Sequence, residues 1–376
     1  MKVVITGGGT GGHLYPGLAI AEALRRRSPG IDILFVGGDR LEARVVPQEG
    51  WPFRSIAARG LPHRVGLGTI RALAATAFGT LQALRWLWAS RPDVVIATGG
   101  YVCAPVGCAA VLTGVPLVVQ EQNLSPGLAT RLLARWARWV SVPHGQAAGR
   151  LRAKRTEITG VPIRRRALEG DRARGLAHWD LEPRRLTLLV LGGSQGAHSL
   201  NQAVCRLADL LMYEARLQIL HQTGTEDLHW VREAIGHREH VGPPAVRHVA
   251  VPFFEAIGDA YACADLVLCR AGASTLAEIT AWGLPAILVP YPFAAQAHQE
   301  ENAEILARAG AAITVRDADL AGTALVDAVQ ALLDDSRRRA AMAAASRALG
   351  RPDAAEVVAG LVIDVGDERI AQEAQA

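Results

Sequence analysis

The sequence has no uninterrupted apolar stretch of roughly 18 residues, the length that a helix needs to cross a bilayer. It begins with a strand-like run, Lys2-Val-Val-Ile-Thr6, so we expect neither a transmembrane helix nor a cleavable signal peptide. Cysteine is scarce as well. The five cysteines, at positions 103, 108, 205, 263 and 269, form no CxxC pair and mostly lie in apolar runs. We therefore expect buried thiols in a reduced, cytoplasmic protein.

The interleaved arginine and aromatic residues that would indicate nucleic-acid binding are also missing. The charge is nevertheless uneven: residues 1–160 hold 19 Lys and Arg against 8 Asp and Glu, whereas the remainder holds 21 against 28. A basic first half suggests an anionic partner. We expect acidic lipid or a phosphorylated substrate rather than nucleic acid.

Glycine is abundant, and short apolar runs alternate with helical patterns. The 376 residues include 38 glycines and 19 prolines and are 50% hydrophobic. This composition indicates an α/β architecture, and the length suits two domains.

The first glycine-rich turn, Gly7-Gly-Gly-Thr-Gly-Gly-His13, follows the first strand pattern and precedes a helix expected over 16–27. On its own it matches a dinucleotide-binding fingerprint only loosely. His13 lies where the carboxyl end of the strand opens into the crevice that binds ligands in open α/β sheets. A histidine in a turn can be purely structural, but the glycines and the helix start favour a functional role.

Residues 59–91 are apolar on most sides, with arginines spaced through them. One interpretation is an ordinary helix packed on a sheet. The other is a surface helix that enters a bilayer with its apolar side chains and meets anionic headgroups with its arginines, which the basic first half favours. The apolar candidates are Ile70, Leu73, Phe78, Trp86 and Trp88, and the basic candidates are Arg64, Arg71 and Arg85.

Three segments of the first half recur in the second. Residues 93–101 correspond to 265–272, residues 114–123 correspond to 283–290, and the opening loop corresponds to 188–197. The recurrence predicts two related doubly wound domains, over 1–162 and 163–350, whose glycine-rich strand ends face a shared central cleft. We expect an apolar helix over 351–366 to return to the first domain, and the residues after about 366 to be frayed.

The stretch Asp265–Glu278 is typical of a strand, a tight turn and a helix start. The unpaired N–H groups of a first helical turn can bind a diphosphate, and Glu278, one turn after Ser274, could bridge two ribose hydroxyls. Alternatively, the small residues only allow close packing and Glu278 favours the helix start.

Taken together, the ordered motifs resemble the MurG family, which transfers N-acetylglucosamine from its UDP donor to undecaprenyl-diphosphate-N-acetylmuramoyl-pentapeptide. The resemblance extends over most of the chain. It implies a GT-B fold of two Rossmann-like domains, with the lipid acceptor on the first domain and UDP-GlcNAc on the second. The motifs are Gly-Gly-Thr-Gly-Gly-His13, Gly99-Gly-Tyr101, Glu121-Gln-Asn123, Gly192-Gly-Ser-Gln-Gly196, Arg270-Ala-Gly-Ala-Ser-Thr-Leu-Ala-Glu278 and His298-Gln299-x-x-Asn302.

The resemblance also implies roles for individual residues. Ser194 and the backbone of Ala273, Ser274 and Thr275 are expected to bind the diphosphate. Glu278 is expected to bind the ribose, and the backbone of Phe254 is expected to bind the uracil. Gln299 is expected to bind the sugar hydroxyls. The residues expected to approach the donor sugar from elsewhere are Thr10, Gly11, Gly12, Asn123 and Arg164. His13, Tyr101 and Glu121 are expected to meet the acceptor.

Three positions depart from the family pattern: Gln120 and Val161 replace a frequent His and Asn, and Ala297 replaces a common Asp. The first departure puts an acid-base role at position 120 in doubt. We therefore consider His13 and Glu121 as the catalytic pair, with His13 as the base, because an imidazole ordinarily titrates near pH 6.5. Helix N-termini can stabilise the leaving UDP, so we expect neither a metal ion nor a cofactor.

The resemblance implies peripheral attachment to the cytoplasmic face of the cell membrane. Because fold alone does not assign chemistry, a UDP-GlcNAc 2-epimerase or another glycolipid transferase remains an alternative. A nucleotide-binding regulator without turnover, or a dehydrogenase suggested by the glycine loop alone, is a more distant one.

Overall fold

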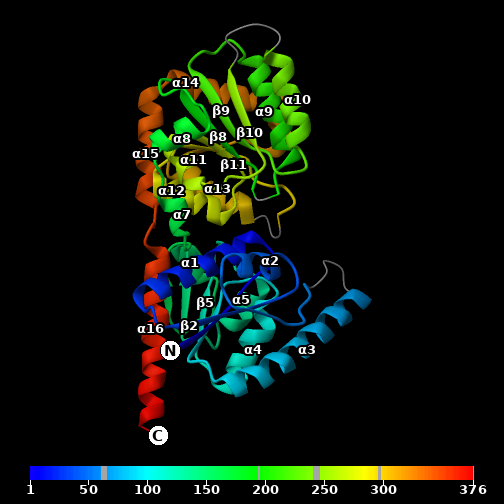
Figure 1. Cartoon of the computed structure of the whole chain (residues 1–376), viewed down its shortest axis with the longest axis vertical. Coiled ribbons are helices and arrows are strands. Elements are labelled where there is room, and N and C mark those ends of the chain that lie inside the picture. The colour runs from blue at the N-terminus through cyan, green and yellow to red at the C-terminus, as the bar shows by residue number, and fades with distance from the viewer. Residues whose placement is uncertain (61–65, 194, 240–245, 295–297, 376) are drawn as a thin grey trace. The chain divides into compact units, whose positions relative to one another are not determined.

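The computed structural model describes residues 1–60, 66–193, 195–239, 246–294 and 298–375 (Figure 1). The chain forms two compact units: unit 1 comprises Met1–Arg164 and Pro352–Ala376, and unit 2 comprises Arg165–Arg351. Each unit contains a parallel sheet with helices on both faces. The expected α/β architecture of two doubly wound, Rossmann-like domains is thereby confirmed.

Unit 1 has a seven-stranded sheet in the order β3-β2-β1-β4-β5-β6-β7. Its strands are β1 (Lys2–Thr6), β2 (Asp32–Gly37), β3 (Phe53–Ser55), β4 (Val94–Ala97), β5 (Leu117–Gln120), β6 (Trp139–Val142) and β7 (Thr156–Ile158). Its helices are α1 (Gly11–Arg27), α2 (Leu41–Gln48), α3 (Leu67–Ser90), α4 (Cys103–Thr113), α5 (Leu128–Leu133), α6 (Gly145–Gly149) and α16 (Ala354–Ala374).

Unit 2 has a six-stranded sheet in the order β10-β9-β8-β11-β12-β13. Its strands are β8 (Leu186–Leu191), β9 (Leu217–Gln222), β10 (Arg247–Val251), β11 (Leu266–Cys269), β12 (Ala286–Leu288) and β13 (Ala312–Thr314). Its helices are α7 (Arg165–Leu168), α8 (Arg172–His178), α9 (His198–Leu210), α10 (Leu228–Glu239), α11 (Ile257–Cys263), α12 (Ala273–Trp282), α13 (His298–Arg308), the 3-10 helix η2 (Asp317–Ala321), α14 (Ala324–Asp334) and α15 (Ser336–Leu349).

Alternation along the central strands divides the core of each unit into two layers. In β1, Val3 and Ile5 pack under α1 and α16, whereas Val4 belongs to the layer under α4. In β8, Leu189 and Val190 likewise belong to opposite layers. Both faces are therefore covered, which explains why these strands are continuous apolar runs rather than alternating ones.

The strand order reverses direction between β1 and β4 in unit 1 and between β8 and β11 in unit 2. In an open parallel sheet, ligands bind outside the carboxyl ends of the strands at this switch point. The loops after β1 and β4, and those after β8 and β11, are the glycine-rich segments that the sequence singles out.

Helix α3 packs along α4 and carries apolar side chains on its outer surface. Trp88 is 75% exposed, whereas Trp86 is half-buried and contacts the core of unit 1. The two neighbouring tryptophans thus have different surroundings, which their spacing alone did not indicate. Among the described residues, no helix combines the length and apolarity needed to cross a membrane. The exposed apolar residues of α3 are Ile70, Leu73, Phe78, Leu81 and Trp88.

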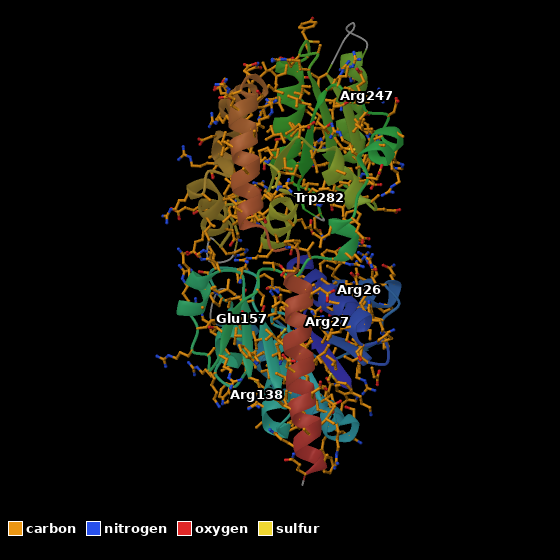
Figure 2. The ribbon with its side chains drawn as sticks, turned by 90° about the vertical axis from the view of Figure 1, so that its left-hand side faces the viewer. Arg26, Arg27, Arg138, Glu157, Arg247 and Trp282 are labelled. Atoms are coloured by element: carbon orange, nitrogen blue, oxygen red, sulfur yellow. The ribbon has the colours of Figure 1, made fainter. Side chains whose placement is uncertain are left out.

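Helix α16 packs on α1 of unit 1 through residues one helical turn apart, Val358, Val362 and Val365. Arg26 and Arg27 of α1 both pair with Glu356, at 2.5 and 2.8 Å (Figure 2).

The helix also continues past residue 366, where we expected fraying, and ends at Ala374. Gly366 is buried, and a Cβ there would lie 2.6 Å from the methyl group of Met1, so the helix makes close contact at this point. Further along, Glu368 pairs with Arg138 at 2.7 Å. These contacts order the segment that the sequence pattern left loose.

We expect Val362→Ala to lower the free energy of unfolding by about 1–2 kcal/mol, because Val362 is fully buried between α16 and α1. The control is Ile370→Ala on the same helix, where the side chain is 42% exposed and the cost is expected to stay below about 0.5 kcal/mol. Urea denaturation of both variants measures the difference. Equal losses would mean that the buried face of α16 does not stabilise unit 1.

Candidate active site

The loop after β1 delivers His13 to the start of α1. Thr10 is the N-cap in an extended conformation, and Gly11, Gly12 and His13 form the first residues of the helix. Thr10 and Gly12 are exposed, while His13 is half-buried. The N–H groups at this helix start face the edge where the sheet changes direction, as the glycine-rich sequence predicts.

The His13 ring lies against the loop after β4. Gly99 and Gly100 have φ values of +99° and +81°, and a Cβ on Gly99 would lie 2.5 Å from His13 Nδ1. Glycine is needed here for both the backbone conformation and the close approach. His13 Nδ1 also lies 3.1 Å from Gln122 Oε1. The sequence analysis did not single out Gln122, although it lies inside the motif Glu121-Gln-Asn123.

Glu121 follows β5 and is only 2% exposed. Its Oε1 accepts hydrogen bonds from the backbone N–H groups of Gln122 and Asn123, both at 3.0 Å, and its Oε2 accepts one from Gly127 at 3.3 Å. The Asn123 side chain also donates to Glu121, at 3.4 Å. The Glu121 carboxylate therefore uses both of its oxygens to hold the loop that follows β5. This arrangement counts against the expected direct contact between Glu121 and an acceptor.

Tyr101 stands beside the glycine loop, and a Cβ on Gly9 would lie 2.9 Å from its ring. Burial raises the pKa of Tyr101 above its ordinary value. A residue that the sequence analysis missed holds this region: Glu42, 1% exposed, accepts hydrogen bonds from Gly9 N at 3.0 Å and Gly38 N at 2.9 Å. A glutamate that follows a second glycine turn by four residues is the signal that could have identified it.

Arg164 was expected to approach a donor sugar, but its guanidinium is occupied within unit 1. It donates to Glu22 at 2.7 Å and to Glu49 at 2.6 Å, and the residue is 8% exposed. Its Nε and Nη2 both donate to Glu22 Oε1, whereas Nη1 and Nη2 donate to the two carboxylate oxygens of Glu49. The arginine therefore fixes the end of the Gly160–Arg164 segment to α1 and α2, which counts against a role in binding ligand.

In unit 2, α12 begins directly after the short loop that leaves β11. Gly272 is the N-cap, so the N–H groups of Ala273, Ser274 and Thr275 form the first turn and have no acceptor within the helix. The Oγ atom of Ser274 is buried and makes no hydrogen bond with any described residue. A buried hydroxyl in the first turn of a ten-residue helix, without a partner, fits a site built for an anion.

Glu278 lies one turn along α12 and accepts a hydrogen bond from Tyr261 Oη at 2.6 Å. Burial raises the pKa of Glu278 from 4.5 to about 7, and the hydrogen bond from Tyr261 and the charge of Arg166 only partly offset it. Tyr261, on α11, is 1% exposed and stacks on Trp282 of α12, with ring centroids 6.3 Å apart. The hydroxyl of Tyr261 thus fixes the orientation of the carboxyl group, a contact that the sequence analysis did not anticipate.

The remaining candidates of unit 2 lie on separate loops. Phe254 N donates to Gln222 Oε1 at 3.2 Å, and Gln222 Nε2 donates to Gly193 O at 2.9 Å, so one glutamine ties two expected ligand-binding loops together. This bond leaves the carbonyl of Phe254, rather than its N–H, for a uracil edge. Ser194 lies outside the described residues.

Gln299 lies in the first turn of α13, where its Oε1 accepts a hydrogen bond from Tyr291 N at 2.9 Å. The side-chain amide keeps its N–H donors for another partner. The expected contact between Gln299 and the sugar hydroxyls would therefore be made by its Nε2 group.

The expectation of a metal-free site overlooked one Asp-x-Asp triplet, Asp317-Ala-Asp319 in η2, a spacing that metal-dependent transferases use. Asp317 pairs with Arg270 at 2.6 Å, and Asp319 pairs with Arg316 at 2.7 Å. Over the described part of the chain, no group of three His, Cys, Asp or Glu side chains could hold a metal ion. The two carboxylates of this triplet thus neutralise arginines of unit 2.

The raised pKa of Glu278 predicts a pH-dependent stability. The folded state binds the proton more tightly than the unfolded chain, so the stabilisation present at low pH is lost as the pH rises through about 7. Relative to Glu278→Gln, the free energy of unfolding of the unmodified chain should fall by about 2–3 kcal/mol between pH 5 and 7.5.

Chemical denaturation across this pH range measures the difference. The matched control is Glu214→Gln, because Arg216 lowers the pKa of Glu214 to about 2 and the carboxylate is ionised throughout the range. A constant difference for Glu278→Gln would show that its carboxyl group is not desolvated.

Comparison with known proteins places this geometry in a family. The N-terminal domain model of glycosyltransferase family 28 matches residues 3–142, and its C-terminal domain model matches residues 187–358. The crystal structure of MurG from Acinetobacter baumannii is similar over 96% of this chain and 99% of that chain, with a TM-score of 0.77 and 27% sequence identity.

Curated relatives are closer in sequence. The UDP-N-acetylglucosamine--N-acetylmuramyl-(pentapeptide) pyrophosphoryl-undecaprenol N-acetylglucosamine transferase of Desulforudis audaxviator is 42% identical over 364 residues, 96% of this chain and 98% of the relative. The enzyme of the same name from Moorella thermoacetica is 42% identical over 366 residues, with 96% and 98% covered. This chain therefore belongs to glycosyltransferase family 28 and, within it, to the MurG family of N-acetylglucosamine transferases.

Proposed function

We propose that this protein transfers N-acetylglucosamine from UDP-N-acetylglucosamine to the undecaprenyl-diphosphate-linked N-acetylmuramyl-pentapeptide, a step of peptidoglycan synthesis. The observation that carries the proposal is the near full-length match to transferases of that name at about 40% identity. The local geometry supports it, because His13 and the first turn of α12 lie at the switch points of their two sheets.

We infer that the acceptor is bound by unit 1. A muramoyl 4-hydroxyl attacks the anomeric carbon while UDP leaves, which inverts the configuration at that carbon. His13 is the group that accepts the proton of the attacking hydroxyl, and Tyr101 lies beside the same loop to contact the acceptor. Glu121 supports this step indirectly, because its carboxylate holds the loop that carries Gln122 and Asn123.

We infer that unit 2 binds the donor. The N–H groups of Ala273, Ser274 and Thr275, together with the unpartnered Ser274 hydroxyl, suit the diphosphate, since the helix dipole stabilises the charge that develops on leaving UDP. Glu278 accepts hydrogen bonds from the ribose hydroxyls, and Gln299 donates to the sugar. The family resemblance also implies that Ser194 and Phe254 belong to the donor site and that Thr10, Gly11, Gly12 and Asn123 contact the donor sugar.

The decisive assay follows radiolabelled N-acetylglucosamine from its UDP donor into a lipid-linked muramoyl-pentapeptide. Transfer should require the acceptor. His13→Ala should lower kcat by roughly 10²–10⁴-fold while UDP binding, measured by calorimetry, stays within about twofold, because the base acts only on the acceptor. The control is His237→Ala, since His237 is on α10 and its ring bonds to a backbone carbonyl of that helix.

The outcomes separate the alternatives. Conversion of UDP-N-acetylglucosamine without acceptor would identify an epimerase instead, and binding without any turnover would identify a regulator. Full activity of His13→Ala with normal donor binding would remove His13 as the base but leave the transferase function intact.

We also infer that unit 1 attaches to the cytoplasmic face of the membrane through α3 and its neighbours. Further exposed apolar residues lie on α4, which packs against α3, and on or just after α5, which packs against α4, and Arg131 and Arg135 are exposed in the same stretch. Such a surface suits insertion into an interface with anionic headgroups. These apolar residues are Leu112 on α4, Leu128 and Leu132 on α5, and Trp136 in the turn after α5.

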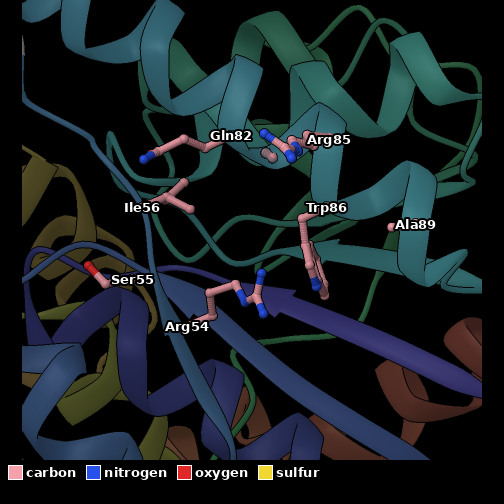
Figure 3. Close-up of a pocket in the computed structure, with 8 residues that line it drawn as sticks. Arg54, Ser55, Ile56, Gln82, Arg85, Trp86 and Ala89 are labelled. Atoms are coloured by element: carbon pink, nitrogen blue, oxygen red, sulfur yellow. The ribbon is translucent and has the colours of Figure 1, made fainter.

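A hollow of about 550 Å³ lies between α3 and the end of β3, with Ile56 directly after that strand (Figure 3). Arg54 and Arg85 line it, and the Arg54 guanidinium lies 5.3 Å from the centre of the Trp86 ring. Arg71, also on α3, is exposed, whereas Arg64 lies outside the described residues. Two arginines beside a tryptophan support the attraction to an acidic surface.

We expect the triple variant Ile70→Ser, Leu81→Ser and Trp88→Ser to weaken sedimentation with vesicles of anionic lipid by about tenfold or more, because each side chain loses roughly 1.5–3 kcal/mol of burial in the lipid. The control is Leu210→Ser with Tyr213→Ser, which removes comparably exposed apolar side chains from unit 2. The KM for UDP-N-acetylglucosamine should not change in either. Unaltered sedimentation of the α3 variant would place the membrane contact elsewhere.

A further inference from the structure

The neighbour of His13 is an amide whose orientation is fixed by its own hydrogen bonds. Gln122 is 2% exposed, and its Nε2 donates to the carbonyl of Thr98 and, at 2.6 Å, to Gln120 Oε1. Both hydrogens of the Gln122 amide are thus used, so its Oε1 is the atom that faces His13.

Gln120 prevents the opposite orientation. It is fully buried, and its Nε2 donates to the carbonyl of Glu121 at 2.9 Å, which leaves its Oε1 for Gln122. Turning the Gln122 amide over would place its oxygen against two other acceptors, Gln120 Oε1 and Thr98 O. In a buried site such an arrangement leaves several polar groups without hydrogen-bond partners, which strongly disfavours it.

The consequence for His13 is a defined tautomer. An oxygen that faces Nδ1 at 3.1 Å requires a hydrogen on Nδ1, and in the neutral ring Nε2 then carries the lone pair. Gly99 and Gly100 also lie against the ring, and the Thr98 hydroxyl fixes the backbone of His13 by donating to its carbonyl at 2.8 Å.

We propose that Gln122, locked by Gln120 and Thr98, is a positioning residue that keeps His13 in the Nδ1–H form with Nε2 free to accept a proton. The catalytic use of that nitrogen rests on the proposed function, but the tautomer itself does not. In the usual triad the orienting partner of a histidine is a carboxylate, whereas here a neutral amide orients the ring without placing a charge beside it.

The first test needs no substitution in the network. Nitrogen-15 NMR of the full chain with labelled histidine, at a pH where imidazoles are neutral, reports which ring nitrogen carries the hydrogen. The chain has 11 histidines, so the His13 signals are identified by their loss in His13→Gln. A hydrogen on Nδ1 alone supports the proposal, and a hydrogen on Nε2, or an even mixture, overturns it.

The second test compares two buried glutamines. Gln122→Met should lower kcat by about tenfold or more, though no further than His13→Ala, with the KM for UDP-N-acetylglucosamine within about twofold and the single tautomer lost. The control is Gln218→Met in unit 2: Gln218 is fully buried, donates to Glu182 O and Thr187 Oγ1, and accepts from Glu182 N. Gln218→Met therefore removes the same kinds of buried side-chain hydrogen bond as Gln122→Met, but away from His13.

Equal kcat values for the two methionine variants, or a retained tautomer in Gln122→Met, would overturn the positioning role. If the unmodified chain fails to transfer N-acetylglucosamine to the acceptor, the proposed function fails, while the NMR result still decides the tautomer. The two proposals can thus fail separately.

Discussion

Every loop that leaves a parallel sheet exposes backbone N–H groups that need acceptors, and in unit 1 buried carboxylates supply them. Glu42 accepts from the loops after β1 and β2, and Glu121 accepts from the loop after β5. Each carboxylate is almost fully buried and fixes glycine-rich or polar backbone that has no regular partner. The position of His13 depends on these contacts, because it follows the loop that Glu42 holds and its ring lies 3.1 Å from Gln122 in the loop that Glu121 holds.

Unit 2 is built from the same sequence of strand, turn and helix, but the hydrogen bonding of its loops differs from that in unit 1. Gln222 links the loop after β8 to Phe254, whereas the N–H groups in the first turn of α12 and the Ser274 hydroxyl have no hydrogen-bond partner among the described residues. A closed loop can hold a reacting side chain in place, and an open helix start can receive an anion. The repeated architecture therefore accounts for the fold, and the difference in loop closure accounts for the division of roles that we propose.

The sequence was sufficient to predict the two doubly wound domains, because glycine turns and apolar strands recur in the same order in both. It could not predict which member of Glu121-Gln-Asn faces His13. Neighbouring residues leave a strand in opposite directions, so the choice between Glu121 and Gln122 depends on where β5 ends. The partners of Arg164 could not be predicted either, because Glu22 and Glu49 lie more than a hundred residues away from it in the sequence.

The ribose-binding role that we propose for Glu278 conflicts in part with the burial of its side chain. A buried carboxyl group with a pKa of about 7 is partly protonated near neutral pH, yet a ribose site needs it as an acceptor. Tyr261 resolves part of this conflict, because its hydroxyl donates to Oε2 and favours the ionised form while leaving Oε1 for a ligand. Two ribose hydroxyls would add further donors to the carboxylate and favour ionisation again. We therefore expect binding of the donor to be coupled to loss of the proton from the Glu278 carboxyl group.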